Sequence, residues 1–248
     1  MTQPDPDQTP TLRSDLSLAH LARSPQSPAQ AGTKPPLLAL LHGVGSNERD
    51  LVQLAPYLDP RFQIVSLRAP LVRGPQSFAW FDVEFLPQGG FRIAPEQIAA
   101  SRDRIAAFLG EAAAAYGADA ERVYLLGFSQ GAIMSLTLAL TQPERLAGAV
   151  PIAGRIPPEV EPWIASPERT AGLPLLLEHG RFDQVIPISW AHRARPILER
   201  QGVALDYREY DAPHSITPRM LDDAAAWLTA RLDEPLPRPR ASGGKEGD

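Results

Sequence analysis

The pentapeptide GFSQG at residues 127–131 constrains the fold more than any other part of this sequence. It directly follows a run of strand-forming residues, Val123–Leu126, and it opens a helical run at Ala132. A serine at such a strand-to-helix turn adopts a strained backbone that lifts its hydroxyl above the edge of a sheet. The flanking glycines are needed because side chains there would collide with the neighbouring strand and helix. The pattern predicts a nucleophilic serine, Ser129, at the end of a strand.

Short apolar runs alternate with helical segments from residue 37 onwards. The expected strands are Leu37–Leu41, Phe62–Leu67, Val123–Gly127, Ala147–Ile152, Leu175–Glu178 and, nearer the sheet edge, Val203–Tyr210. The expected helices are Pro95–Tyr116, Gln130–Thr141, Pro187–Gln201 and Pro218–Leu232. We expect Pro196 to kink or split the third helix, Thr217 to cap the fourth, and Leu16–Leu21 to form an edge strand or a hairpin arm. The alternation predicts an α/β fold with a mostly parallel central sheet covered by helices on both faces.

Length and composition indicate how much of the chain belongs to this fold. A chain of 248 residues with 44% hydrophobic and 21% charged residues can bury one large core, so we expect a single domain over residues 12–234. Residues 1–11 and 235–248 are rich in proline and polar residues, and we expect both to be disordered tails. The net charge of −5, without a basic block, argues against nucleic acid as a partner.

Several kinds of site and location are disfavoured. The chain has no cysteine, which excludes disulfides, thiolate metal sites and a cysteine nucleophile. The first ten residues lack the apolar stretch of a secretory signal and no apolar run reaches membrane-spanning length, so we expect a cytoplasmic protein without stable membrane insertion. His179 and Asp183 have helix-like ligand spacing but lie across a strand end and a turn, so we expect no metal and no cofactor.

The general base is expected to be His214. A serine hydroxyl is a poor nucleophile at its free pKa and needs an adjacent base and an orienting acid. With this motif, the acid and then the histidine follow the serine along the chain, each in a loop beyond a strand. His214 lies between the last strand and the last helix, whereas His179 ends a buried strand and His192 lies within a helix. Without Ser129, His214 would be read as a surface loop histidine.

The acid is expected to be Asp183, which follows a strand and a glycine turn. Its carboxylate would accept the imidazole N–H, fix the tautomer and stabilise the imidazolium. Glu178 is the rival, but it lies inside the strand. Asp206 and Asp211 are nearer to His214 in sequence and belong to the following strand and loop.

An oxyanion site needs two amides that point to where negative charge develops. One is the amide of Gln130, directly after the serine. The other should come from the glycine-rich segment 42–47, where Val44 stands between two glycines. The alternative is that this segment is a plain glycine-rich turn.

Together these motifs resemble the phospholipase/carboxylesterase family of small serine hydrolases, which includes the acyl-protein thioesterases. The matching segments are LLHGVG (40–45), AWFD (79–82), LGFSQG (126–131), HGRFD (179–183) and PH (213–214). The resemblance implies an α/β-hydrolase fold with little or no lid, metal-independent hydrolysis, and oxyanion amides at Val44 and Gln130. Arg181 and Phe182 occupy positions that are more often small or polar in this family, which bears on substrate preference.

The expected activity is hydrolysis of a carboxylic ester, with a small-molecule ester or acyl compound as substrate. The main alternative is an acyl-protein thioesterase or lysophospholipase. A second alternative transfers the acyl group to an alcohol or amine. A third, from another class, is a non-catalytic binding protein on a hydrolase scaffold, which the complete set of motif residues disfavours.

The long connection from Leu67 to Pro95 offers residues that could contact substrate. Trp80 and Phe81 either line an acyl pocket or pack this connection onto the core. The apolar segment Phe85–Phe91 could form an exposed rim that serves a homodimer or a lipid-like substrate.

Overall fold

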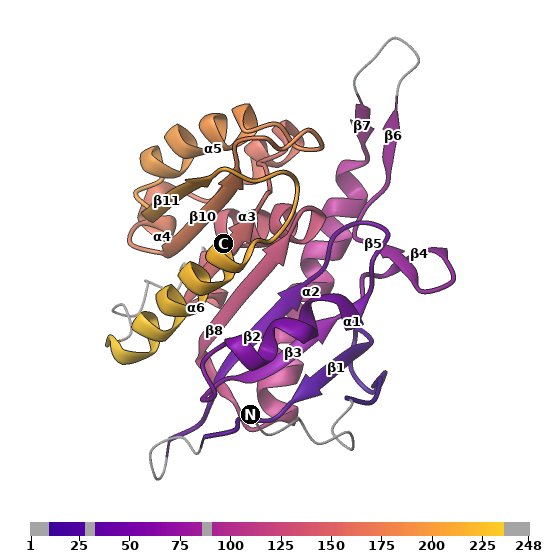
Figure 1. Cartoon of the computed structure of the whole chain (residues 1–248), viewed down its shortest axis with the longest axis vertical. Coiled ribbons are helices and arrows are strands. Elements are labelled where there is room, and N and C mark those ends of the chain that lie inside the picture. Colours follow the sequence, from indigo (N-terminus) through magenta and orange to yellow (C-terminus); the bar gives the residue numbers. More distant parts are fainter. Residues whose placement is uncertain (1–9, 28–32, 86–90, 236–248) are drawn as a thin grey trace, which may run out of the picture.

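A computed structural model describes residues 10–27, 33–85 and 91–235. The chain folds around a seven-stranded sheet with the strand order β1-β3-β2-β8-β9-β10-β11 (Figure 1). These strands are β1 (His20–Arg23), β2 (Pro36–Leu41), β3 (Gln63–Leu67), β8 (Asp119–Phe128), β9 (Gly148–Ile152), β10 (Pro174–Gly180) and β11 (Ala204–Tyr210). Every neighbouring pair is parallel except β1 and β3, which confirms the mostly parallel sheet.

The central strands are apolar because both faces of the sheet are covered. All residues of β2, β9 and β10 are buried. β8 lies in the middle of the sheet, and its Gly127 is level with Leu41 of β2 and Pro151 of β9. The loops that follow these strands therefore leave the sheet at one edge.

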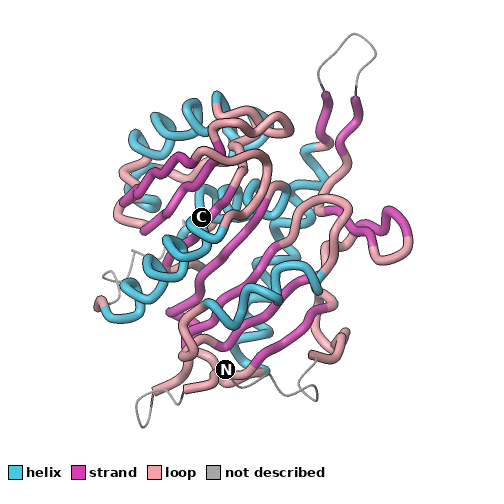
Figure 2. The backbone as a smooth tube through the Cα atoms, in the orientation of Figure 1, coloured by secondary structure: helices cyan, strands magenta, loops and turns pink. Residues whose placement is uncertain are grey.

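Different helices cover the two faces of the sheet (Figure 2). The helices are α1 (Glu48–Leu51), α2 (Pro95–Ala115), α3 (Gln130–Thr141), α4 (Pro167–Thr170), α5 (Ser189–Arg200) and α6 (Pro218–Asp233), with 3-10 turns η2 (Val52–Tyr57), η3 (Pro143–Arg145) and η4 (Pro158–Trp163). One hydrophobic cluster takes side chains from α2, α3 and α5, and a second takes them from α1, η2 and α6. This arrangement confirms the expected layers.

The expected helices are present, with one correction. Thr217 caps α6, since its hydroxyl oxygen accepts a 3.2 Å hydrogen bond from the amide of Met220. The expectation that Pro196 splits its helix is wrong, because α5 runs through it, and the alternative that Pro196 kinks the helix stays a prediction. Pro196 stands on the exposed side of α5. There, water can satisfy the carbonyl that the missing proline N–H leaves free.

The connection between β3 and α2 contains two short antiparallel hairpins. They are β4 (Leu71–Gly74) with β5 (Ser77–Ala79), and β6 (Val83–Phe85) with β7 (Phe91–Ile93). The β6–β7 hairpin projects from the body of the molecule (Figure 1). Residues 86–90 and the side chains of Phe85 and Phe91 lie outside the described part, so the apolar rim stays a prediction.

An edge strand, one of the two expectations for Leu16–Leu21, is present as β1, but it begins only at His20 and overlaps the expected segment at its last two residues. Leu18 and Leu21 of this segment are buried, and the Ser17 amide donates to a Glu111 carboxylate oxygen of α2 at 2.7 Å. The expected tails fall mainly on residues 1–9 and 236–248, which lie outside the described residues, and stay predictions. Within the described chain, no helix is both long and apolar enough to cross a membrane.

Candidate active site

Ser129 stands at the turn between β8 and α3 with φ 55° and ψ −116°, a conformation that a residue with a side chain rarely adopts. Its amide donates to Ile152 O at 3.0 Å, and its carbonyl accepts from Ile133 of α3. The two motif glycines are required by close backbone approach. A Cβ on Gly131 would lie 1.9 Å from Leu41 O, and one on Gly127 would lie 2.3 Å from Gly131 O. The predicted strained turn is therefore present.

The loops after β10 and β11 lie against each other and bring Asp183 and His214 together. The amide of Arg181 donates to Tyr210 O at 2.7 Å, and that of Phe182 donates to Ala212 O at 3.0 Å. His214 Nδ1 lies 2.6 Å from Asp183 Oδ2, and His214 Nε2 lies 2.9 Å from Ser129 Oγ. The three side chains chosen from the sequence thus form one hydrogen-bonded chain.

The hydrogen-bond partners determine which atom of His214 carries the proton. A carboxylate only accepts hydrogen bonds, so His214 Nδ1 donates to Asp183. The neutral ring then has an unprotonated Nε2 that can accept the hydroxyl hydrogen of Ser129. The ring of Phe128 packs beside the imidazole, with centroids 4.9 Å apart.

The Asp183 carboxylate is held by groups other than His214. Its Oδ1 accepts the amides of Val185 and Ile186, each at 2.8 Å, in an Asx-type turn. His179 Nε2 lies 2.7 Å from Ile186 O and 3.4 Å from Asp183 Oδ2. Burial lowers the pKa of His179, which keeps this ring neutral.

The rival bases and acids have other partners. His192 pairs with Glu209, Asp206 with Arg208, and Asp211 with Arg181. Glu178 is fully buried, and Tyr210 Oη lies 2.5 Å from its Oε1. Burial raises the pKa of Glu178 to about 8, so it is largely protonated at neutral pH and unsuited to orient an imidazolium.

The segment after β2 lies beside the serine at Gly43. A Cβ built on Gly43 would lie 3.3 Å from the Ser129 Cβ, so Val44 follows a residue that touches the serine. Within the described residues, neither the Val44 amide nor the Gln130 amide donates to another group of the chain. Both are free to bind a ligand oxygen.

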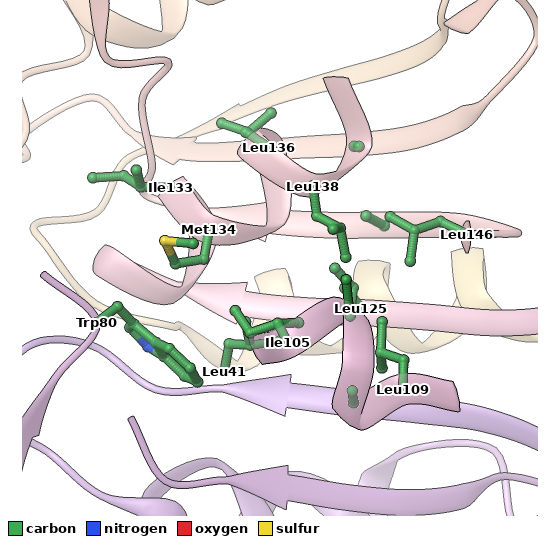
Figure 3. Packing of buried hydrophobic residues seen from close by; sticks show 14 of the residues in the cluster. Leu41, Trp80, Ile105, Leu109, Leu125, Ile133, Met134, Leu136, Leu138 and Leu146 are labelled. Carbon is green, nitrogen blue, oxygen red and sulfur yellow. The ribbon is translucent and has the colours of Figure 1, made fainter. Parts of the chain in front are cut away.

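Trp80 and Phe81 are 0% and 1% exposed and belong to the larger hydrophobic cluster. Figure 3 shows Trp80 among the side chains of this cluster. This burial matches the packing alternative for the Leu67–Pro95 connection, and substrate contact by either ring stays a prediction. The exposed large apolar side chains in the site segments are instead Val44 (55%), Phe182 (63%) and Val185 (68%). Among the described residues, no three His, Cys, Asp or Glu side chains gather as a metal site.

Sequence reasoning missed the groups that hold the site in place. These are His179 beside Asp183, and the side chain of Gln130, whose Oε1 accepts the Trp80 amide at 2.8 Å. The signal for the turn is Asp183 itself, because an aspartate side chain readily accepts a hydrogen bond from the backbone amide two residues on. No local pattern reveals the Gln130 contact, because its partners lie about fifty positions earlier in the chain.

Comparison with known proteins places this chain in a family. A family model described as Phospholipase/Carboxylesterase matches residues 24–232. Acyl-protein thioesterase 1 of Eremothecium gossypii is 32% identical over 226 residues, which cover 81% of this chain and 90% of the relative. Among solved structures, esterase PE8 aligns with a TM-score of 0.70 at 31% identity over 85% of this chain and 99% of its own. A Mesorhizobium loti carboxylesterase aligns with a TM-score of 0.74 at 25% identity over 89% and 98%.

Proposed function

The chain belongs to the phospholipase/carboxylesterase family of serine ester hydrolases, and we propose that it cleaves carboxylic esters through an acyl-enzyme on Ser129. The observation that carries the proposal is the hydrogen-bonded chain from Ser129 Oγ through His214 to Asp183. An isolated buried serine would have no base to take its proton, and here the base and its orienting acid are both in contact.

Acylation begins when Ser129 Oγ attacks the acyl carbon and His214 Nε2 takes the hydroxyl proton. The resulting imidazolium keeps its Nδ1–H on Asp183 Oδ2, whose negative charge stabilises it. The tetrahedral intermediate collapses as the ester C–O bond breaks. The alkoxide leaves with the proton from His214 Nε2, and the acyl group stays on Ser129.

The amides of Val44 and Gln130 stabilise the negative oxygen of the tetrahedral intermediate in this proposal. Gln130 is the first residue of α3, so its amide also lies at the positive end of the helix dipole. Removing one such donor costs about 10²–10³-fold in kcat in enzymes where this has been tested.

Deacylation repeats the same steps with water. His214 Nε2 takes a proton from water as the hydroxide attacks the acyl carbon, and Ser129 Oγ then leaves with that proton. The carboxylic acid is released and the serine is regenerated. No group beyond the chain and water is needed.

The test is turnover of p-nitrophenyl butyrate by the wild-type protein and by Ser129→Ala. We expect the variant to lose nearly all turnover and all labelling by a fluorophosphonate probe while its circular dichroism spectrum is unchanged. Ser135→Ala, a buried serine of the same helix, is the matched control and should keep both. Wild-type-like turnover in Ser129→Ala would refute the proposal.

A second candidate substrate class is long-chain thioesters or lysophospholipids. It is favoured by the similarity to an acyl-protein thioesterase and by the exposed apolar side chains of Val44, Phe182 and Val185 in the site segments. A series of p-nitrophenyl esters from two to sixteen carbons, beside matched acyl thioesters, distinguishes the two. A maximum at short chains supports a small-ester carboxylesterase, and a maximum at long chains or on thioesters supports the second candidate.

Location and assembly complete the proposal. A cytoplasmic location is supported by a sequence without cysteine. Cell fractionation tests it. A homodimer is one of the two roles that the sequence allows for the segment Phe85–Phe91. Light scattering of the purified protein tests it, and a monomer mass at every concentration would exclude it.

A further inference from the structure

We propose that the side chain of Gln130 is a positioning group for the oxyanion site. It holds Trp80, and through Trp80 it holds the segment 42–46 so that the Val44 amide faces the same point as the Gln130 amide. The inference rests on the proposed function, because it adds a residue to that reaction.

The first link joins Gln130 to the Trp80–Phe81 backbone. Gln130 Oε1 accepts the Trp80 amide at 2.8 Å, and Gln130 Nε2 donates to Phe81 O at 2.7 Å. A backbone N–H can only donate and a carbonyl can only accept, so these partners fix the orientation of the side-chain amide. Gln130 is 3% exposed, and water does not compete for either bond.

The second link joins Trp80 to the segment 42–46. Trp80 Nε1 donates to His42 O at 2.9 Å, and its ring lies against the His42 imidazole with centroids 5.7 Å apart. Ser101 Oγ donates to Trp80 O from α2. Trp80 therefore has a fixed backbone and a fixed ring. It acts as a rigid support for His42, two residues before Val44.

Phe78, two residues before Trp80, holds the chain on the other side of Val44. Phe78 O accepts the Gly45 amide at 2.8 Å, and the Phe78 amide donates to Ser46 O at 2.9 Å. Residues 78 and 80 thus hold the chain on both sides of Val44, which is itself 55% exposed. The direction of the Val44 amide depends on where residues 78–81 lie, and Gln130 holds that segment next to the nucleophile. One residue supplies an oxyanion donor with its backbone and orients the other donor with its side chain.

Gln130→Met tests the inference, because methionine has a similar length and volume but cannot replace either hydrogen bond. We expect kcat to fall about 10- to 100-fold with little change in KM, since the interaction weakened is made mainly in the transition state. The loss should stay below the 10²–10³-fold expected for a donor that is removed outright. A raised KM with an unchanged kcat would overturn the inference.

Gln97→Met is the matched control. Gln97 holds the next residue of the same segment in a similar way, since its Oε1 accepts the Asp82 amide and its Nε2 donates to an Asp82 carboxylate oxygen. Gln97 has no contact with Trp80 or with segment 42–46 among its hydrogen bonds. Gln97→Met should keep wild-type kcat. A loss of kcat equal to that of Gln130→Met would mean that the Gln130 effect is only one of general packing.

Trp80→Phe is the second variant, since it removes the indole N–H and keeps an aromatic ring. If both residues act through the same segment, the double variant should lose about as much kcat as the worse single variant, within about 3-fold. Fully multiplicative losses would mean that the two side chains act independently and would overturn the proposed link.

Hydrogen exchange supplies a readout that does not depend on activity. Peptides that cover residues 42–46 should exchange faster in Gln130→Met and in Trp80→Phe than in the wild type, and at the wild-type rate in Gln97→Met. Unchanged exchange in both variants would overturn the inference. A wild-type protein without esterase activity would count against the proposed function alone, because the exchange result would still decide whether Gln130 holds the segment.

Discussion

At the scale of single residues, Asp183 differs from the other carboxylates near His214 in that both of its oxygens are engaged by the site. Oδ1 accepts two backbone amides and Oδ2 accepts His214 Nδ1, so the carboxylate has one orientation. Because the carboxylate has one orientation, the effect of replacing its Oδ2 by an NH₂ group can be predicted.

We expect Asp183→Asn to lower kcat by about 10⁴-fold without unfolding the protein. The asparagine oxygen would stay on the amides of Val185 and Ile186, which turns its NH₂ group toward His214 Nδ1. Nδ1 must then accept, the proton moves to Nε2, and the ring can no longer take the Ser129 proton. Steady-state kinetics on p-nitrophenyl butyrate measure the loss. Asp211→Asn should keep wild-type kcat, and activity retained in Asp183→Asn but lost in Glu178→Gln would reassign the acid.

A second prediction at this scale concerns the buried Glu178. Burial raises its pKa from 4.5 to about 8, so the folded protein holds a proton that the unfolded chain releases above pH 4.5. The contribution of this group to the free energy of unfolding is therefore largest below pH 4.5. It falls as pH rises to about 8, by up to about 1.4 kcal/mol per pH unit from this group.

Urea unfolding at pH 5, 7 and 9 checks this dependence. Glu178→Gln keeps the size of the side chain and its hydrogen bond to Tyr210 but has no charge to bury, so its advantage over the wild type should grow with pH. A constant difference between the two proteins from pH 5 to 9 would contradict the raised pKa.

At the scale of elements, the contact between α3 and β2 sets the height of the nucleophile. The backbone of α3 reaches β2 only because residue 131 is glycine. The same chain offers a glycine in a helix where no such contact exists, because a Cβ on Gly110 of α2 would meet nothing within 4 Å.

We expect Gly131→Ala to destabilise the protein by about 3 kcal/mol or more, because the methyl would meet the rigid backbone at Leu41 O. Gly110→Ala should instead stabilise it by about 0.5–1 kcal/mol, since alanine is the better helix former. Thermal and urea unfolding measure both changes. Similar stabilities for the two variants would show that α3 can move away from β2 without loss.

At the scale of the whole molecule, the edge strand β1 lies outside the family match, which begins at residue 24. It nevertheless covers the outer edge of β3 and buries Leu21 to 1% exposure. In the strand order, β3 and β2 separate β1 from β8, the strand that leads to Ser129.

We therefore expect Leu21→Ala to lower the free energy of unfolding by about 2–5 kcal/mol while leaving kcat and KM of the folded enzyme unchanged. Val72→Ala, at a side chain that is 72% exposed, is the control and should change neither quantity appreciably. Unfolding curves and initial rates at 25 °C check both. An equal effect on kcat would mean that β1 shapes the site.

The same scale shows which parts of this molecule can be predicted from sequence. The central strands and long helices were predicted because they bury apolar residues with a clear period, and the strand-to-helix turn with its order of acid and histidine is a local pattern. The β4–β5 and β6–β7 hairpins were not, since strands of three or four residues have too few positions to show a period. The predicted split at Pro196 was wrong, because the effect of a proline on a helix depends on which side of α5 faces water. The Gln130 contact is a meeting of distant positions that only the folded chain brings about.

Val44, Ser129, Asp183 and His214 follow β2, β8, β10 and β11, so the reactive constellation spans most of the chain and includes its last strand. We expect such distant pairings to form late, since each closes a long loop of chain. Chemical reactivity is then the final property that the polypeptide acquires after synthesis. A fluorophosphonate added at intervals during refolding would report when the edge strand β11 joins the sheet. A nascent chain that has not yet been extended to His214 would not react with the probe.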